Sequence, residues 1–216
     1  MSSWRSRRRI WDISQTLRPG LPVWPGDTAF MFERSWRMED GSPVNVGRMT
    51  MSTHSGTHGD APLHYAADAD DIAAVELDPY IGECLVIDAT QVAGGRIDVG
   101  DLPHIESADR VLFRTFDAFP HDKWDSTFTA ISADAIAWLA LQGVKLVGTD
   151  APSVDPQDSK TMDAHKAVLA HDMRILEGLV LDGVPEGRYE LIALPLKIAG
   201  GDAGLCRAIL RDLVDD

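Results

Sequence analysis

Five short apolar runs occupy the middle and second half of the chain, and they limit the folds that it can adopt. They cover residues 84–88, 111–113, 145–148, 178–182 and 189–194. Runs of this length are typical of buried strands and are too short for buried helices. Further extended stretches are expected around residues 10–14, 30–37 and 48–53, in a first third that is rich in Pro, Gly and Trp. The chain is therefore expected to fold around a β-sheet.

Only two helices are expected beside these strands. Ser132 is a candidate N-cap for a helix over residues 133–141, which would stop at Gly143. A second helix is expected around residues 162–170. Many strands with few helices, at spacings that mix hairpins and crossovers, predict an α/β fold with a mixed β-sheet core. No G-x-G-x-x-G follows a strand, so a doubly wound dinucleotide-binding fold is not expected.

Length and charge narrow the possible organisation and partners. The 216 residues contain no repeat or low-complexity linker, and we expect a single domain over residues 10–216. The net charge of −14 argues against binding to nucleic acid or to an anionic membrane surface. No window approaches the roughly 18 apolar residues of a membrane-spanning helix.

Residues 1–9 are expected to be a flexible basic tail, with arginine at positions 5, 7, 8 and 9. Because Asp12 follows Ile10 and Trp11 directly, the apolar core of a secretory signal is missing. Cys84 and Cys206 are expected to be buried, reduced thiols. Together these features predict a cytoplasmic protein.

Histidines concentrate in residues 54–64, which read His-Ser-Gly-Thr-His-Gly-Asp-Ala-Pro-Leu-His. Seven histidines spread evenly over 216 residues would put only ~0.4 in such a window, whereas three occur here. A single histidine is usually a surface residue or a satisfied core residue. Three of them with an aspartate indicate a metal site.

The spacing within this segment predicts how the ligands would converge. Gly56, Gly59 and Pro62 argue against a helix, and in an extended chain the even-numbered residues share one side. That side carries His54, His58, Asp60 and His64, with Gly56 leaving room for an ion between the first two imidazoles. Imidazole and carboxylate together suit zinc, manganese or iron better than calcium or magnesium.

Further ligands are expected from a distant part of the chain, where the candidates are His165, His171, Asp172 and Glu177. His165 and Glu177 are twelve residues apart, about 120° out of phase on an ideal helix, so they need a break between them to converge. Residues 171–173 are a suitable place for that break. His104 and His121 are expected to be solvated loop residues.

The segment matches, position for position, the H-x-G-T-H-x-D-x-P-x-H pattern of the cyclase family of metal hydrolases, which the chain therefore resembles. The likeness extends to residues 22–27, which read Pro-Val-Trp-Pro-Gly-Asp, to residues 148–155, and to the stretch from His165 to Glu177. It covers nearly the whole chain after the arginine-rich start. It implies a single domain with a mixed sheet in a layered, swivelling β/β/α architecture.

The resemblance also implies a role for individual residues. His54, His58 and Asp60 would hold a first zinc ion, and Asp60 would bridge to a second zinc held by His165 and Glu177. Glu177 would be able to reach both ions, and manganese could replace zinc. His64 would donate and accept protons, and Trp24 would contact the substrate. The protein would be a homodimer that hydrolyses an aromatic formamide.

The chemistry of amide hydrolysis is consistent with these roles. A metal-bridged hydroxide would attack the carbonyl carbon, and His64 has a suitable ordinary pKa to shuttle a proton to the leaving amine. No Gly-x-Ser-x-Gly elbow supports a serine hydrolase. A cyclic-amide or isatin-type hydrolase of the same family is the nearest alternative, and a non-catalytic metal-binding protein is a remote one.

Three features near the expected site allow two interpretations. Asp150 and Asp155 lie in a Pro-containing loop after an apolar strand, where functional residues often occur. Aspartates beside proline also form turns, which is at least as good an explanation. The tryptophans other than Trp24 are expected to pack in the core or the tail.

Overall fold

A computed structural model describes residues 8–213 of the chain. The flexible tail predicted for residues 1–9 lies mostly outside the described residues. The two tail residues that are described contact the sheet. The Arg8 guanidinium lies 3.0 Å from a carboxylate oxygen of Glu190, and that of Arg9 stacks 3.4 Å from the ring centroid of Trp11.

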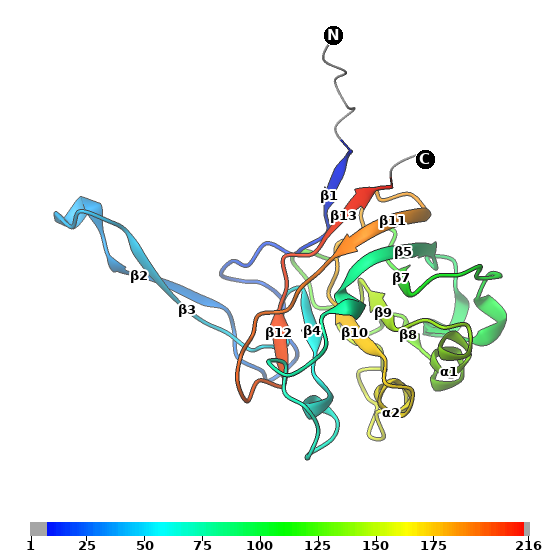
Figure 1. Cartoon of the computed structure of the whole chain (residues 1–216). Coiled ribbons are helices and arrows are strands. Elements are labelled where there is room, and N and C mark those ends of the chain that lie inside the picture. The colour runs from blue at the N-terminus through cyan, green and yellow to red at the C-terminus, as the bar shows by residue number, and fades with distance from the viewer. Residues whose placement is uncertain (1–7, 214–216) are drawn as a thin grey trace, which may run out of the picture.

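A mixed sheet of nine strands forms the centre of the domain (Figure 1). The strands are β1 (Ile10–Asp12), β4 (His58–Asp60), β5 (Ile81–Asp88), β7 (Arg110–Arg114), β9 (Leu146–Thr149), β10 (Arg174–Glu177), β11 (Gly187–Ile192), β12 (Ala203–Leu205) and β13 (Ile209–Asp212). Their order across the sheet is β1-β13-β11-β5-β7-β9-β10-β4-β12. The four central strands β5, β7, β9 and β10 run parallel, and the outer strands pair antiparallel. The α/β fold with a mixed sheet is as predicted.

Each face of the sheet buries its own hydrophobic core. Along β7, Val111 and Phe113 face the two helices, whereas Leu112 points to the opposite face. On that opposite face the outer strands curl over the central ones and enclose a second core around Tyr80. Burial on both faces explains why the central strands are continuous apolar runs.

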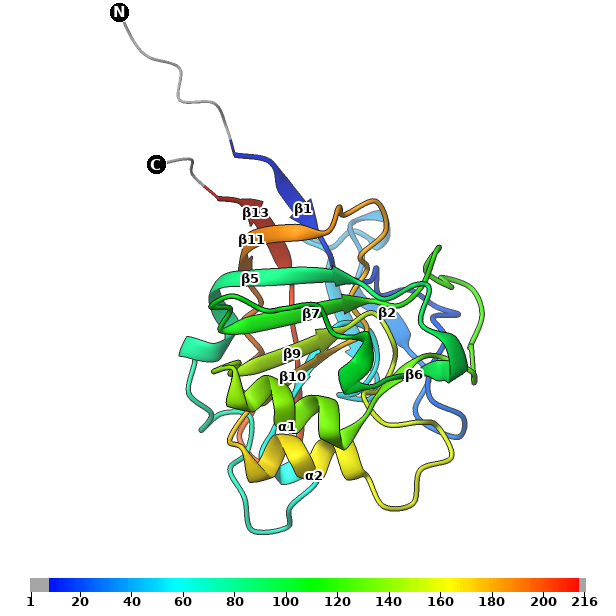
Figure 2. The same cartoon turned by 90° about the vertical axis from the view of Figure 1, so that its right-hand side faces the viewer.

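Two α-helices cover one face of the sheet (Figure 2). Helix α1 (Ala133–Leu141) begins after Ser132, whose side chain accepts a hydrogen bond from the backbone N–H of Ala135. Helix α2 (Asp163–Ala170) packs beside it. Both helices agree with the sequence prediction, and neither of them, nor any other helix of residues 8–213, has the length and apolar character needed to cross a lipid bilayer. Short 3-10 helices lie at Met38–Asp40, Pro62–His64, Asp78–Tyr80, Ala93–Gly95 and Val99–Asp101.

The strand predicted over residues 178–182 was wrong, because the strand β10 ends at Glu177. Gly178 has a φ of +62°, and a Cβ atom there would lie 2.6 Å from the carbonyl oxygen of Gly56. The chain therefore turns at this glycine, and Leu179 and Leu181 after it are buried in irregular structure. The strands β10, β12 and β13 had not been predicted.

A two-stranded hairpin projects from the domain (Figure 1). Its strands are β2 (Met31–Trp36) and β3 (Val46–Thr50), and every residue in both is exposed. Both had been expected, although β3 begins and ends earlier than the predicted range of 48–53. Another small sheet pairs β6 (Arg96–Ile97) with β8 (Ala130–Ile131) in parallel.

Candidate active site

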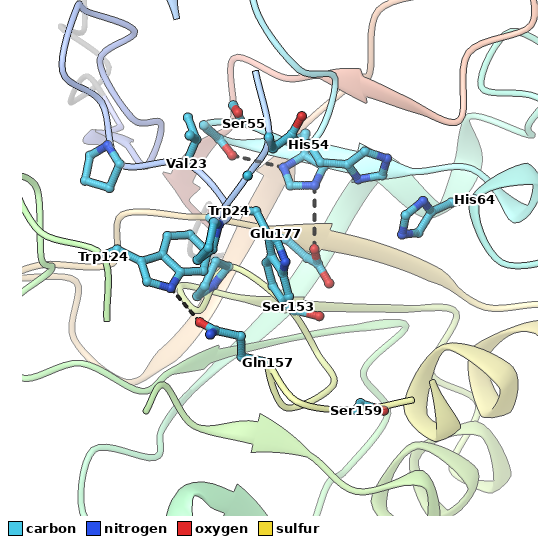
Figure 3. Close-up of a pocket in the computed structure, with 18 of the residues that line it drawn as sticks. Val23, Trp24, His54, Ser55, His64, Trp124, Ser153, Gln157, Ser159 and Glu177 are labelled. Carbon is cyan, nitrogen blue, oxygen red and sulfur yellow. Dashed lines mark hydrogen bonds and ion pairs between the residues drawn. The ribbon is translucent and has the colours of Figure 1, made fainter. Parts of the chain in front are cut away.

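A cavity of about 510 Å³ opens beside the carboxyl end of β10. Three of its walls come from segments far apart in the sequence: the loop of residues 22–27, the histidine-rich segment, and residues 152–159. Figure 3 shows Trp24 and Trp124 on one side of this pocket and His64 on the other, with Glu177 between them. All the residues predicted to carry the chemistry lie in or directly behind this pocket, except His171 and Asp172, which are exposed.

The pairing of β4 with β10 brings together three of the predicted ligands. His58 and Asp60 share one side of β4, and the antiparallel register sets His58 opposite Glu177. The Nε2 atom of His58 lies 3.5 Å from Oε2 of Glu177 and 3.4 Å from Oδ1 of Asp60. All three side chains are buried.

Asp60 is the centre of the cluster, because its two oxygens face different histidines. Oδ1 lies 3.2 Å from Nδ1 of His54 and also faces His58, whereas Oδ2 lies 3.3 Å from Nε2 of His165. Glu177 is divided in the same way, with Oε2 toward His58 and Oε1 3.7 Å from Nε2 of His165. Each carboxylate can thus reach two neighbouring ligand positions.

The motif does not adopt the extended conformation that the sequence suggested. Only residues 58–60 form a strand, while residues 53–57 turn and residues 62–64 form a 3-10 helix. Gly56 has a φ of +74°, and a Cβ atom there would lie 2.6 Å from Cδ2 of Leu17. A glycine is therefore needed here for a turn that packs against Leu17. The prediction that Gly56 leaves room for an ion between two imidazoles was wrong.

In the buried histidines His58 and His165, the Nδ1 atom contacts an oxygen atom. Nδ1 of His58 lies 3.0 Å from the carbonyl oxygen of Gly56, and Nδ1 of His165 lies 2.6 Å from Oδ2 of Asp155. These contacts fix each ring and leave its Nε2 atom facing the carboxylates. Hydrogen bonding of this kind to the outer nitrogen is the usual arrangement around metal-bound histidine.

The carboxylates change the protonation of the buried imidazoles. Burial acts to lower the pKa of His58, but the neighbouring Asp60 and Glu177 outweigh it and raise the pKa to about 10. Burial likewise opposes a charged His165, while Asp155 and Asp60 raise its pKa to about 10. Burial would raise the pKa of Asp60, yet the surrounding histidines hold it well below its usual range. The site strongly attracts positive charge.

The donor set fits a metal ion. Nε2 of His58 and both carboxylate oxygens of Asp60 are buried, and within the described part of the chain they have no hydrogen-bond partner. Buried polar groups that lack a hydrogen bond are costly unless something else binds them. One candidate ligand group is His54, His58 and Asp60, and another is Asp60, His64 and His165. Imidazole and carboxylate together suit zinc or manganese.

His64 lies at the edge of the ligand cluster. Its ring centroid is 4.0 Å from that of His54 and 5.7 Å from that of His165. Its pKa is lowered, mainly by burial and also by the neighbouring histidines, although Asp60 acts to raise it. A neutral imidazole at this position can accept a proton from a group bound in the pocket.

The opposite wall of the pocket is aromatic. Trp24 and Trp124 meet edge to face, with ring centroids 5.4 Å apart, and Phe128 packs against both. Nε1 of Trp124 donates a 2.6 Å hydrogen bond to Oε1 of Gln157. The expectation that Trp124 serves only core or tail packing was wrong, because it lines the pocket. Its sequence neighbourhood gave no signal of this role.

Three further aspartates lie at or near the site, two whose role was open from the sequence and one that had not been identified. Asp155, which had been weighed as a turn residue, contacts His165 and is buried. Asp150 is also buried and accepts hydrogen bonds from Thr115 and Phe116. Asp202 was not identified at all, although its Oδ2 atom lies 3.1 Å from Nε2 of His54. His104 and His121 are exposed, as expected.

The sequence is similar to a known family and to curated proteins. The sequence model of the Cyclase family matches residues 11–156. A curated protein of Erythrobacter litoralis named kynurenine formamidase is 79% identical over 215 residues, which cover 100% of this chain and 99% of that protein. A second protein of that name, from Sphingopyxis alaskensis, is 58% identical over 207 residues, or 95% of this chain and 99% of that protein.

Solved structures show the same fold. A structure described as a predicted metal-dependent hydrolase from Bacillus stearothermophilus aligns with a TM-score of 0.83 and 31% identity, covering 96% of this chain and 100% of that one. Isatin hydrolase A from Ralstonia solanacearum aligns with a TM-score of 0.82 over 95% of this chain and 92% of that one. Its sequence identity of 23% extends the likeness to the fold alone.

Proposed function

This chain belongs to the Cyclase family of metal-dependent hydrolases, and we propose on that premise that it hydrolyses N-formyl-L-kynurenine to L-kynurenine and formate. The observation that carries the proposal is the buried cluster in which Asp60 and Glu177 each face two histidines, beside an aromatic pocket. The 79% identity to a kynurenine formamidase over the full chain supports the choice of substrate.

Two metal ions per subunit would use the whole cluster. His54, His58 and Asp60 would hold the first, and Asp60, His165 and Glu177 would hold the second, with Glu177 within reach of both. The division of both carboxylates between neighbouring histidines supports this assignment. When bound, zinc or manganese supplies a polarised carbonyl and an activated water at neutral pH.

His64 would manage the proton that the reaction moves. An arylamine is a poor leaving group as a bare anion, so it needs a proton when the C–N bond breaks. The surroundings of His64 lower its pKa, which favours the neutral imidazole, and the ring lies beside the ligand cluster. It would accept a proton from the attacking water and donate it to the departing nitrogen.

Trp24 and Trp124 would bind the aromatic ring of the substrate. Both present apolar ring surface to the pocket from the wall opposite His64 (Figure 3). Flat aromatic surfaces bind aromatic ligands by stacking and edge-to-face contact. The reacting formamide would then lie between the tryptophans and the ligand cluster, where the carboxyl and imidazole groups converge.

Exposed apolar residues and buried thiols bear on the assembly and the location of the protein. We propose a homodimer whose contact is the β2–β3 hairpin, since Met31, Phe32 and Trp36 on it are at least half exposed. Cys84 and Cys206 are both buried and unpaired, as expected of a protein in the reducing cytoplasm.

The test is to follow hydrolysis of N-formyl-L-kynurenine by absorbance, with zinc-loaded and chelated samples side by side. We expect rapid turnover that is lost on chelation and restored by zinc or manganese. Isatin, a cyclic amide, is the matched comparison substrate. Turnover of isatin but not of the formamide, in a sample shown to hold metal, would refute the substrate and favour the alternative within the family.

A further inference from the structure

Asp202 lies beside the ligand cluster although it is far from the motif in sequence. It immediately precedes β12, which pairs antiparallel with β4 so that Ala203 stands opposite Asp60. The backbone carbonyl of Asp202 accepts a 2.9 Å hydrogen bond from the N–H of Ala61. The sheet itself therefore fixes where the Asp202 side chain begins.

The side chain of Asp202 contacts the motif through both oxygens. Oδ1 accepts a 2.9 Å hydrogen bond from Oγ1 of Thr53. Oδ2 lies 3.1 Å from Nε2 of His54 and 3.9 Å from Nδ1 of His64. Because Thr53 holds one oxygen, the other is directed at the two imidazoles.

This contact determines which nitrogen of His54 is available. When Nε2 of His54 carries the ring proton and donates it to Asp202, the lone pair of Nδ1 is left on the side of Asp60, whose Oδ1 lies 3.2 Å away. The arrangement repeats what Asp155 does for His165, on the opposite side of Asp60. His58 uses a backbone carbonyl for the same purpose.

The same carboxylate also lies against the proton-transfer residue. The rings of His54 and His64 stack with centroids 4.0 Å apart and an angle of 39° between their planes. Asp202 borders both rings at one edge, so a shift of His54 would displace the surface on which His64 rests.

We propose that Asp202 is a positioning residue that fixes the tautomer and orientation of His54 as a metal ligand and, through the stacked rings, the placement of His64. The proposal rests on the proposed function in taking His54 as a metal ligand and His64 as the proton-transfer residue. Loss of such a carboxylate partner typically weakens metal binding 10- to 100-fold.

The experiment measures binding of Zn²⁺ and Co²⁺ alone, without substrate. Asp202→Ala should weaken the first metal site about 10- to 100-fold in competition with a chelator and change the visible spectrum of the Co²⁺ protein. Asp202→Asn keeps an oxygen acceptor for His54 and should recover part of the affinity. Asp68→Ala, which removes an exposed carboxylate from the loop after the motif, is the control for charge alone.

Thr53→Val provides a milder variant in case Asp202→Ala does not fold. It removes only the hydroxyl that orients Oδ1, and it should weaken the same site to a smaller extent. The proposal would be overturned if Asp202→Ala kept the metal affinity and the Co²⁺ spectrum of the unmodified protein. If the alanine variant does not fold, the same result in Thr53→Val and Asp202→Asn would overturn it. The proposal would also be overturned if Asp202→Asn and Asp202→Ala both lost one ion completely, because Asp202 would then be a direct ligand. Failure of formamide hydrolysis would leave these results unchanged.

Discussion

The Asp155 carboxylate lies 2.6 Å from Nδ1 of His165 and also accepts hydrogen bonds from the backbone N–H groups of Ala164 and His165. These N–H groups belong to the first turn of α2, where helix donors otherwise lack partners. Met162, at the N-cap position, makes no side-chain cap. One residue therefore both caps the helix and orients the imidazole that the helix carries.

Replacing Asp155 should separate these two effects. Asp155→Asn should keep an acceptor for the helix but weaken the hold on His165, so metal affinity should fall about 10- to 100-fold. Asp155→Ala should in addition lower the free energy of unfolding by about 1–2 kcal/mol, because the helix N-terminus loses its acceptor. Metal titration and thermal unfolding of both variants measure the effects. Unchanged metal affinity in both would contradict the orienting role.

His64→Ala should abolish most turnover without loss of metal. We expect kcat to fall at least 100-fold, since general acid–base groups contribute about 10²–10⁴-fold. Asp60→Ala is the contrasting variant, because Asp60 faces three histidines and its loss should empty the site of metal. Metal content by elemental analysis, measured beside kcat, checks both. A fully active His64→Ala enzyme would contradict the proton-transfer role.

The parts of this fold that were predictable from sequence are those with local causes. Helix α1 begins where Ser132 can cap it, and the central strands β5, β7 and β9 are apolar because both of their faces are buried. The strands β4 and β12 have three residues each, too few for a pattern, and they form because β4 pairs with β10 on one side and with β12 on the other.

The residues of the candidate site likewise fall into those that a local pattern predicts and those that it does not. The histidine-rich segment stands out in composition, and its resemblance to a family picked out His165 over His171. The contacts of Asp155, Trp124 and Asp202 depend on segments brought together by the tertiary fold. Asp202 is separated from His54 by 148 positions, and no local pattern links the two residues.

The stability of the metal-free protein should fall as the pH rises, whereas metal binding should strengthen. His58 and His165 have pKa values of about 10 in the fold, raised from an ordinary 6.5. A raised pKa contributes stability that is complete below about pH 6.5 and is lost as pH rises toward about 10. Metal binding requires neutral imidazole and strengthens with pH. The gain in Tm on adding zinc to chelated protein should therefore grow between about pH 6 and pH 9, and a gain that shrinks would contradict this.

Trp124→Ala should impair substrate binding more than the metal site. Trp124 packs on Trp24 and is held by Gln157, so its removal opens the aromatic wall of the pocket. We expect KM to rise about 10-fold, as one buried aromatic contact of about 1.5 kcal/mol would give. Trp124→Phe keeps a ring but loses the hydrogen bond, and should have a smaller effect. Kinetics with N-formyl-L-kynurenine and an unchanged metal content test this, and an unaltered KM would remove Trp124 from the substrate site.

The projecting hairpin should be the contact of a homodimer. Phe32 and Met49 form a cross-strand pair on it, and both side chains are half exposed. The ring of Phe32 covers Gly47, where a Cβ atom would lie only 2.3 Å from it, so the ring is held in place on the ribbon. Apolar side chains that are fixed in position and exposed to water favour burial against a second copy. Phe32→Asp would place a charge in that contact and should convert the dimer to a monomer in light scattering after size exclusion. Glu33→Gln, at an exposed neighbouring position, should leave the dimer intact. A monomeric unmodified protein would exclude this assembly.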